Sequence, residues 1–441
     1  MAPLASVFPV SESTRSRSSL ALFGDPEFAA LASARFVRGM SFATIIIALA
    51  LYADKYAATG VVAGLFGTVY ALVRLVFVLP VGRAIDLGDG KRYLLAGLVA
   101  NAAILFGYVQ VGAIEHVVAL RALQGGGSAL LIVGTTTVIG EVAPEADRGH
   151  WIGVSGQVKS AASLLGDMVG GGMLYAYGFR TTYTVLIGIT AVSVLLVFLF
   201  VRWDPGERSD ADERTGLETY RQLLARGGIR ALVVFRFAFS FGKMAVIIFL
   251  PIFARTEFGM TSFAIGGIIA GGRVTKALTQ GYVGALGDRT GNLSHYVLGG
   301  AFVYALGTAA VPFALNAGDV LEPIALSALS RTIAIHPAWL WLFGCYVVLG
   351  IGDSLRIPSS FSMFVDEGEE YNAVAGSISL RSVSWQVGAV TGPFTVGAVL
   401  DYSSFYAAFW LAAALVVVSG IVFALLVPTF SFGNDAVKRF S

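Results

Sequence analysis

The chain has 441 residues, 56% of them hydrophobic and 13% charged, and a formal net charge of +2. In a soluble domain roughly a quarter of the residues are charged, so this composition excludes an ordinary soluble protein. The net charge alone says nothing about nucleic acid, but no basic tract with interleaved aromatic residues appears, so nucleic acid is not expected as a partner.

The first element in chain order is a Ser-rich segment, residues 1–34, which has no basic stretch followed by a long apolar core. It predicts an N-terminal tail rather than a signal peptide. Beyond it, apolar runs of about twenty residues recur, and each is long enough to cross a bilayer as a helix. We predict an all-α membrane protein with twelve transmembrane helices, over residues 36–57, 60–82, 92–113, 115–141, 152–177, 181–202, 230–254, 261–285, 293–315, 338–364, 373–399 and 405–428.

The widest hydrophilic break, residues 204–229, separates the sixth and seventh of these spans. Its second part places Leu217, Tyr220 and Leu224 at helical intervals, which is typical of an amphipathic helix on the membrane surface. A solvated linker is the alternative interpretation.

The distribution of Lys and Arg between the loops predicts the orientation, because cytoplasmic loops of membrane proteins are enriched in these residues. Few fall on the predicted outer side, namely Lys55, Arg180, Arg255 and Arg331. Many more fall on the other side, including Arg15, Arg17, Arg35, Arg38, Arg83, Lys91, Arg92, Arg148, Arg202, Arg208, Arg214, Arg221, Arg226, Arg230, Arg289, Lys438 and Arg439. Both termini, the central loop and the C-terminal tail, residues 429–441, are therefore expected in the cytoplasm.

The chain repeats itself with an offset of roughly 200 residues. Arg35-Phe36 matches Arg236-Phe237, and Gly82 and Asp86 match Gly284 and Asp288. Later matches have a larger offset, Glu141 with Asp366 and Gly166 with Gly392, as a duplication with loop insertions would produce. Two pseudo-symmetric six-helix halves, residues 35–203 and 230–428, are predicted, and such repeats are typical of transporters.

Two short charged loops carry a recognisable motif. GALGDRTGN (284–292) resembles the loop motif of the major facilitator superfamily, and GRAIDLGDGKR (82–92) is similar, with one inserted residue and Leu87 in place of the usual Arg. The residues that match it are Gly82, Asp86, Lys91, Arg92, Gly284, Asp288, Arg289 and Gly291.

Other segments resemble further motifs of this family. RALQG (121–125) is similar to the motif of its fourth span. ASLLGDMVGG (162–171) is similar to the fifth-span motif of its antiporters, with Asp167 in place of Pro, and GAVTGPFTVG (388–397) is its counterpart in span eleven. The helix-packing residues that these motifs supply are Gly166, Gly170, Gly171, Gly388, Gly392 and Pro393.

The resemblance implies that Asp86 and Asp288 each approach the N-terminus of a helix in the opposite half when the protein opens outward. The partial positive charge of a helix N-terminus attracts a carboxylate. Arg289 and Lys91 would pair with nearby acids or carbonyl groups. A solubilising turn is the alternative interpretation of these loops.

Charged residues within the predicted spans are costly in a bilayer and indicate function. Asp167, Asp353 and Arg121 are candidates for proton coupling, because a buried Asp beside a cation can take up and release protons. The candidates for substrate binding are Arg74, Lys276, Lys243, Arg273, Arg356 and Gln124. Arg74 and Lys276 occupy matching positions in the two halves, so we expect them to face each other across a cavity and hold an anion.

Structural roles remain open for several of these charges. Asp353 and Arg356 can form a purely structural ion pair, and Arg121 can be structural. Lys159 and Arg381 can extend to the cytoplasmic surface or pair with Glu141 and Asp366.

We therefore expect a secondary active transporter of a small solute, coupled to protons and working as a monomer in the plasma membrane of a prokaryote. The antiporter-like motif favours drug or metabolite efflux, whereas the surplus of bases favours an organic or inorganic anion. A non-transporting receptor or scaffold is the alternative of another class. Enzyme chemistry is not expected, and the single Cys345 and the scattered His116, His150, His295 and His336 indicate neither a metal nor a cofactor.

Overall fold

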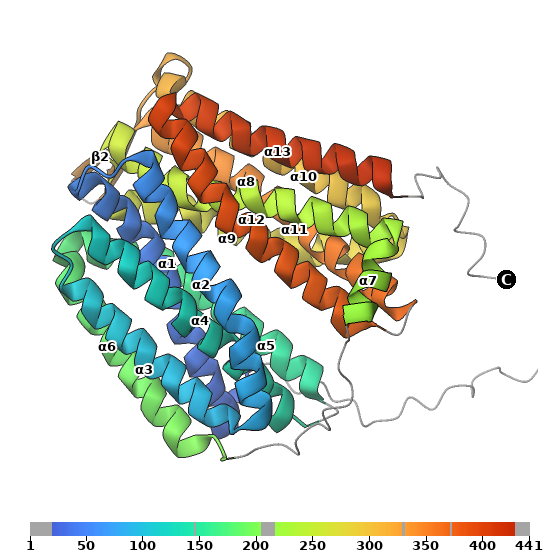
Figure 1. The fold of residues 1–441 in the computed structure, drawn as a ribbon. Helices are drawn as coiled ribbons and strands as arrows, with labels where there is room; N and C mark the ends of the chain where they lie inside the picture. Colours follow the sequence, from blue (N-terminus) through green and yellow to red (C-terminus); the bar gives the residue numbers. More distant parts are fainter. Residues whose placement is uncertain (1–19, 145–146, 204–216, 329–330, 371–372, 428–441) are drawn as a thin grey trace, which may run out of the picture.

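The structure, a computed structural model, describes residues 20–144, 147–203, 217–328, 331–370 and 373–427. These residues fold into two helical bundles that lie side by side (Figure 1). The first half contains η1 (Ala21–Gly24), α1 (Pro26–Lys55), α2 (Gly60–Leu87), α3 (Gly90–Val109), α4 (Ile114–Val142), α5 (Arg148–Leu165), η3 (Gly166–Gly170) and α6 (Gly171–Phe200).

The second half follows a short helix, α7 (Leu217–Ala225). It contains α8 (Gly227–Phe258), α9 (Ser262–Thr290), α10 (Leu293–Ala310), η4 (Val311–Asp319), β1 (Ile324–Ala328), β2 (Arg331–Ile335), α11 (Pro337–Glu369), α12 (Val374–Tyr402) and α13 (Phe405–Leu426). The expected all-helical architecture of two bundles is confirmed. The ends of the chain beyond residues 20 and 427, which include the predicted C-terminal tail, lie outside the described residues.

The number of membrane spans depends on how two regions are counted. In the described part of the chain, ten helical segments are long and apolar enough to cross a membrane. One of them is the 53-residue run Arg148–Phe200. This run bends at Gly178, whose φ of 73° is a left-handed value that favours glycine. Dividing the run there, and adding α9, which carries Arg273 and Lys276 in its middle, gives the twelve segments predicted.

Several boundaries differ from the prediction. The first helix begins at Pro26 rather than at residue 36, because the Asp25 carboxylate caps it by accepting hydrogen bonds from the N–H groups of Glu27 (2.8 Å) and Phe28 (3.2 Å). The predicted tail therefore ends earlier than residue 34. The predicted span 293–315 divides into α10 and η4, and the antiparallel hairpin of β1 and β2 that follows was not predicted.

The second part of the central loop forms a helix, α7. An amphipathic helix was one of the two structures expected here, but the face that is buried differs from the predicted one. Leu223 is the buried residue, at 2% exposure, whereas Leu224 is 38% exposed. Residues 204–216 and the side chain of Leu217 lie outside the described part.

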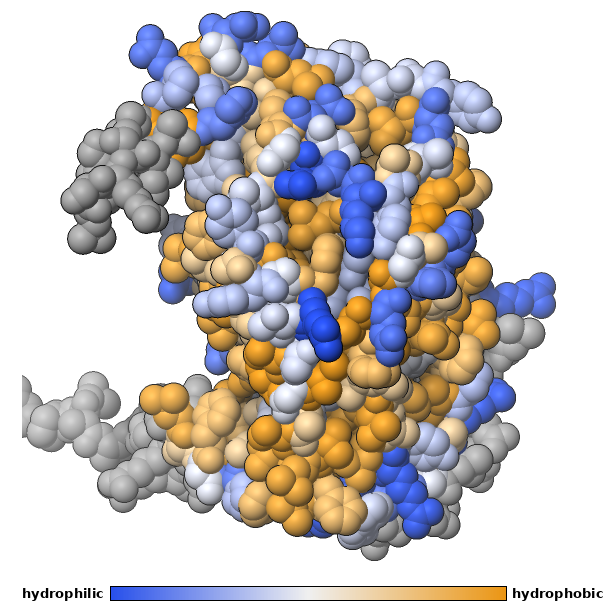
Figure 2. Space-filling view, turned by 90° about the vertical axis from the view of Figure 1, so that its left-hand side faces the viewer, coloured by the Kyte–Doolittle hydropathy of each residue, from blue (hydrophilic) through white to orange (hydrophobic). Residues whose placement is uncertain are grey.

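The outer surface of the bundles is apolar, as a lipid-facing surface must be. Figure 2 shows hydrophobic residues dominating the lower part of one side of the molecule, at the height of α3 and α6 in Figure 1. Exposed apolar surface on this scale marks a membrane or a partner interface. Exposed residues of α3 and α6 include Val99, Phe106, Val192, Leu195, Phe198 and Leu199.

Candidate functional site

The two halves meet along a seam, and one end of this seam is tightly closed. Gly60, Gly64 and Gly67 of α2 pack against Gly397 and Pro393 of α12 so closely that a Cβ atom at any of the three would collide with the other helix. Glycine lets two backbones approach each other in this way. We call this the hairpin end of the seam, because the hairpin of β1 and β2 lies at the same end of the bundles (Figure 1).

Ionic and hydrogen-bonded contacts reinforce the hairpin end. The Asp401 carboxylate, at the end of α12, accepts hydrogen bonds from the backbone N–H groups of Gly60 and, at 2.8 Å, Val61. These groups begin α2 in the other half, where helical N–H groups have no partner of their own. The Arg255 guanidinium of α8 pairs with the Asp54 carboxylate of α1 at 2.8 Å, again across the seam.

At the opposite end, which we call the motif end because both loop motifs lie there, the helices diverge. Ala71 of α2 and Ala389 of α12 are still buried together with Met244. Further along the same face of α2, Val78 is partly exposed, and a Cβ atom at Gly82 would meet nothing within 4 Å. Figure 1 shows the two bundles spreading apart toward this end. The seam is therefore closed at the hairpin end and open at the motif end.

The loop motifs end α2 and α9 at the open end. Gly291 terminates α9 in a left-handed conformation, with φ of 67°, and its N–H donates to the carbonyl of Gly287 at 3.0 Å. Gly82 and Gly284 lie within the helices, and Arg289 is exposed in the last turn of α9. The side chains of Asp86 and Asp288, the predicted clamp, lie outside the described part.

Lys91 holds the first loop to the end of α6. Its ammonium group donates to the carbonyl oxygens of Phe198 (2.8 Å) and Val201 (2.6 Å) and lies 4.0 Å from the centre of the Trp203 ring. Lys91 therefore contacts carbonyl groups, one of the two kinds of partner expected for it. Asp89, which sequence reasoning did not single out, caps α3, and Arg92 lies 3.9 Å from it.

Asp353 of α11 is the centre of an ion cluster inside the second half. It pairs with Lys243 of α8 and, at 2.8 Å, with Arg356 one turn along its own helix. The Arg356 guanidinium is 1% exposed and lies 3.7 Å from the centre of the Phe239 ring. One carboxylate is thus shared by two cations in an apolar surrounding.

Asp167 forms the second ion pair within the bundles, and this pair crosses the seam. Asp167 lies in η3, where the helix widens to a π-helical turn between α5 and α6, and its side chain is fully buried. Its partner is Arg273 of α9 in the other half, whose side chain is 36% exposed. The neighbouring backbone is tight, because a Cβ atom at Gly266 of α9 would collide with the Asp167 carbonyl oxygen.

Arg121 of α4 is fully buried and is held by neutral groups. Its guanidinium donates to the carbonyl oxygen of Phe66 (2.7 Å) and to the side-chain oxygen of Gln124 (2.6 Å), one turn along the helix. It also lies 4.4 Å from the centre of the Tyr70 ring. Arg121 therefore ties α4 to α2 within the first half.

Four further cations form a row across the open part of the seam. They are Arg38 (α1), Arg74 (α2), Lys159 (α5) and Lys276 (α9), and a Cβ atom at Gly39, next to Arg38, would collide with the Lys159 carbonyl oxygen. In the part of the chain that the structure describes, none of the four forms an ion pair with a carboxylate. We call these residues the basic row. Arg74 and Lys276, which were expected to face each other across a cavity, both belong to this row, and their facing each other stays a prediction.

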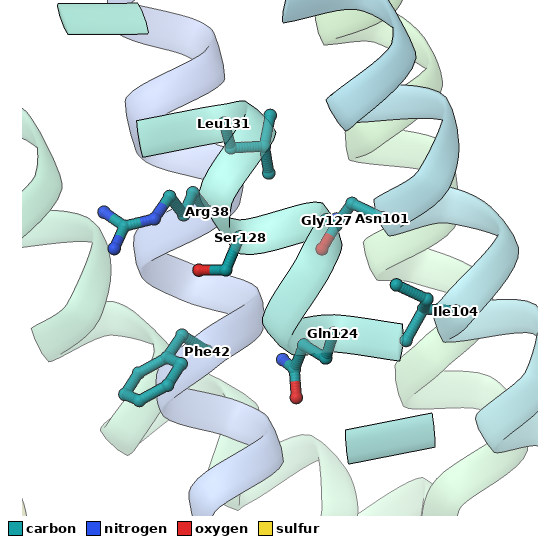
Figure 3. Close-up of a pocket in the computed structure, with 8 residues that line it drawn as sticks. All are labelled: Arg38, Phe42, Asn101, Ile104, Gln124, Gly127, Ser128 and Leu131. Carbon is teal, nitrogen blue, oxygen red and sulfur yellow. The ribbon is translucent and has the colours of Figure 1, made fainter. Parts of the chain in front are cut away.

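A small pocket lies beside the basic row, inside the first half. It is shallow, with a free volume of about 10 Å³ between α1, α3 and α4, roughly the room of one water molecule. Figure 3 shows the Arg38 guanidinium and the Phe42 ring on one side of it, and Asn101 and Ile104 of α3 on the other. Gln124, a predicted binding residue, extends from α4 between them.

The glycines of the predicted antiporter-like motif lie at close helix contacts. A Cβ atom at Gly166 or Gly170 would collide with Met40 or Thr44 of α1, and one at Gly171 would lie 2.7 Å from the Ser262 carbonyl oxygen across the seam. The counterpart glycines Gly388 and Gly392 approach the α8 backbone at Phe237 and Phe241 in the same way.

Sequence reasoning identified the charges but not their partners. The pairs of Asp167 with Arg273 and of Lys243 with Asp353 join residues more than 100 positions apart, and no local spacing reveals such contacts. The sequence analysis used Arg38 only as a signal of orientation. It expected Lys159 to extend to the cytoplasmic surface or to pair with an acid. The sequence analysis did not identify the group formed by Asp401, Asp54 and Arg255. Each of them is a charged residue at the end of a predicted span, and this shared position is a signal that could have identified them.

Comparison with known proteins agrees with this architecture. The family profile described as Major Facilitator Superfamily matches residues 31–326 and 237–436. A multi-drug resistance efflux pump PmrA homolog of Lactococcus lactis is 22% identical over 89% of this chain and 92% of its own length. The multidrug resistance protein MdtG of Dickeya zeae is 25% identical over 87% of this chain and 90% of its own.

Solved structures share the fold. A bacterial homolog of the human lysosomal transporter Spinster, in an inward-facing and occupied conformation, superposes with a TM-score of 0.71 at 13% identity, over 91% of this chain and 96% of that one. The human organic anion transporter MFSD10 (TETRAN) superposes with a TM-score of 0.60 at 15% identity, over 90% of this chain and 99% of its own. At these identities the likeness concerns the fold alone.

Proposed function

The chain belongs to the major facilitator superfamily, a family of multi-pass membrane transporters, and we propose that it is a secondary active transporter that moves a small solute by alternating access. One observation carries this proposal: the halves are closed at the hairpin end and apart at the motif end, with an ion pair between them in mid-seam. A receptor or scaffold on the same fold has no need of buried ions that join two separable halves.

The motif end is the cytoplasmic end in this proposal. The excess of Lys and Arg in the loops at that end supports the assignment, and it places both termini in the cytoplasm. The described conformation is then inward-facing. The multi-pass architecture is compatible with the plasma membrane, which is the proposed location, and the protein would work there as a monomer.

The pair of Asp167 with Arg273 is the proposed coupling element. Opening the hairpin end must move α9 away from η3, which takes Arg273 from a carboxylate that is otherwise fully buried. An isolated buried carboxylate favours its neutral, protonated form, whereas a cation beside it favours the charged form. Proton binding by Asp167 and separation of the halves would therefore promote each other, which is the linkage that proton-coupled transport requires.

Efflux by exchange with protons is the proposed direction. The relatives named multidrug efflux pumps cover most of the chain and support it, although they are only 22–25% identical. The antiporter-like motif around Gly166 and Gly170, at the contact of η3 with α1, supports it independently.

Cysteine accessibility in native membranes tests alternating access without knowledge of the substrate. On a background with the buried Cys345 replaced by Ala, a cysteine at Ala389 reports the closed part of the seam and one at Val78 reports the open part. Transport requires a second state in which Ala389→Cys reacts and Val78→Cys is protected. We expect the two reaction rates with a methanethiosulfonate reagent to change in opposite directions between pH 5.5 and pH 8, roughly the range in which a buried carboxyl group titrates.

The Asp167→Asn protein serves as the matched variant, since its side chain has the same shape but cannot titrate. Loss of the pH response in this protein supports the coupling assignment. A cysteine at position 389 that stays unreactive at every pH, in the parent and in Asp167→Asn, would contradict alternating access. Opposed rate changes that persist unaltered in Asp167→Asn would leave transport standing and refute Asp167 as the coupling residue.

A further inference from the structure

We propose that the basic row binds an organic anion with an apolar body, and that this anion is the transported solute. The inference rests on the proposed transport function and specifies its substrate class. It is carried by the placement of four cations, Arg38, Arg74, Lys159 and Lys276, on four helices of both halves around the open part of the seam.

The basic row is costly unless something compensates its charge. All four side chains are half-buried, so each charge is only partly hydrated. The Nε atoms of Arg38 and Arg74 are buried and have no hydrogen-bond partner. Buried donors and like charges of this kind call for an acceptor of negative charge.

The carboxylates of the bundles are already engaged elsewhere. Asp353 is shared by Lys243 and Arg356, and Asp167 is paired with Arg273. A cationic solute would have to displace one of these bases and would meet the basic row unscreened. An anionic solute finds free positive charge, so the electrostatics of the seam select the sign of the ligand.

Aromatic residues beside the row indicate an apolar body on the anion. Phe42 lines the pocket next to Arg38 (Figure 3), and its ring centre lies 5.6 Å from that of Tyr70. Tyr70 itself is buried, whereas Phe42 is partly exposed. A ring can pack on Phe42 while its acid group reaches the row, a contact that an inorganic anion cannot make.

A pair of probes with one ring system and opposite charges tests the sign directly. 1-Naphthalenesulfonate and 1-naphthylmethylammonium are titrated separately into the full-length protein in detergent, and thermal stability is followed. A ligand that binds the folded state raises the melting temperature. We expect the sulfonate to stabilise the protein and the ammonium compound not to do so.

Substitutions locate the site. Lys159→Gln and Arg74→Gln are each expected to weaken sulfonate binding by about tenfold, because each removes one charge-assisted contact. Arg230→Gln is the matched control, since Arg230 is exposed at the motif end outside the row. Without ligand, Lys159→Gln should melt at a higher temperature than the parent, because it relieves repulsion within the row.

Three results would overturn the anion site: stabilisation by both probes alike, sulfonate binding that survives both substitutions, or no stabilisation by the sulfonate up to millimolar concentrations. Failure of this proposal is distinguishable from failure of the transport function. Reciprocal cysteine accessibility at Ala389 and Val78 would still show alternation in a protein that binds no anion.

A separate observation, the Asp401 contact, carries a second inference: we infer that Asp401 is a latch that holds the hairpin end shut. Its carboxylate meets the first N–H groups of α2 from the opposite half, where the helix end carries partial positive charge. Gly60 admits the close approach, because a Cβ atom there would collide with the Gly397 carbonyl oxygen. The contact exists only while the two halves touch.

Accessibility of a cysteine in the closed seam tests the latch. Asp401→Asn keeps the shape and removes the charge, so the reaction rate of Ala389→Cys should rise about fivefold. Glu322→Gln is the matched control, since Glu322 is an exposed acid at the same end, outside the seam. An unchanged rate in Asp401→Asn, or an equal rise in Glu322→Gln, would refute the latch.

Discussion

The two carboxylates inside the bundles occupy opposite settings. Asp353 is held by Lys243 and Arg356, and all three belong to the second half. Asp167 is held by Arg273 alone, and this pair joins the two halves. A rigid movement of one half against the other leaves the first cluster intact and must break the second. Whether an ion pair is structural or can break during transport therefore depends on whether it crosses the seam, rather than on how deeply it is buried.

The exposure of the cations agrees with this distinction. Arg356 is 1% exposed, so its charge depends on Asp353 in every conformation that keeps the second half folded. The Arg273 side chain is 36% exposed and has a route to water when its partner leaves. A buried cation without a partner is costly, whereas a hydrated one is not.

The largest expected effect follows from Asp353. Asp353→Asn leaves Lys243 and Arg356 as partnerless buried cations, and breaking a buried pair in this way costs about 3–5 kcal/mol. We expect a marked loss of thermal stability in detergent at neutral pH. The comparison would fail if Asp167→Asn destabilised the protein as much as Asp353→Asn.

A double variant shows whether the loss comes from stranded charge. Lys243→Met removes one of the two cations and keeps a side chain of similar length. Combined with Asp353→Asn it should recover about 1 kcal/mol or more relative to the single variant, because residues of one ion cluster are strongly non-additive. Additive losses would show that the aspartate matters for its packing.

The next effect concerns the seam itself. Gly64→Val places a branched side chain against the Pro393 carbonyl oxygen, and overpacking of this kind costs typically about 1–3 kcal/mol. The closed seam should open at the hairpin end, which separates Arg273 from Asp167 and leaves Asp353 with its partners. A cysteine at Ala389 should then react faster than in the parent.

Gly188→Val is the control for the introduction of a bulky residue into a helix. A Cβ atom at Gly188 would meet nothing within 4 Å, so the substitution should leave the accessibility of position 389 unchanged. An equal rise in both variants would indicate general loosening of the bundles.

Asp167→Asn should affect stability less than the preceding variants do, and it should affect proton coupling more. The partly exposed Arg273 can be hydrated, so the loss in stability should be about 1 kcal/mol or less, the range of a solvent-accessible pair. Alternation itself should continue but lose its dependence on pH, because the titrating group is gone. In everted vesicles, exchange of a solute down its own gradient should survive while transport driven by a pH gradient disappears.

Much of the fold was predictable because apolar runs, loop charges and the internal duplication are local or periodic signals. The π-helical turn at Gly166–Gly170 was not, because it arises where η3 packs on α1 and α9. The hairpin of β1 and β2 was missed because its strands are short and follow a span that was predicted to run on to residue 315. The early start at Pro26 was readable from Asp25, but hydropathy alone set the boundary later.

For the site, the sequence revealed which residues are charged but not how they are distributed between the halves. Asp353 and Arg356 are one helical turn apart, so their pairing followed from spacing. The partner of Asp167 depends on how α9 crosses η3, which no spacing within one helix contains. Arg74 and Lys276 are related by the duplication, and their facing each other across a cavity stays a prediction.

The smallest expected effect lies at the open end and reverses the direction of the others. Asp288→Asn removes the charge that the loop motif implies for a contact in the outward-facing state, where a carboxylate at a helix N-terminus is worth typically about 0.3–1 kcal/mol. The inward-facing state, in which the motif end is open, should gain a few-fold in population. A cysteine at Val78 should then react faster and one at Ala389 more slowly. The same shift in Glu322→Gln, or the opposite shift in Asp288→Asn, would show that the two ends of the seam are not held by opposing contacts.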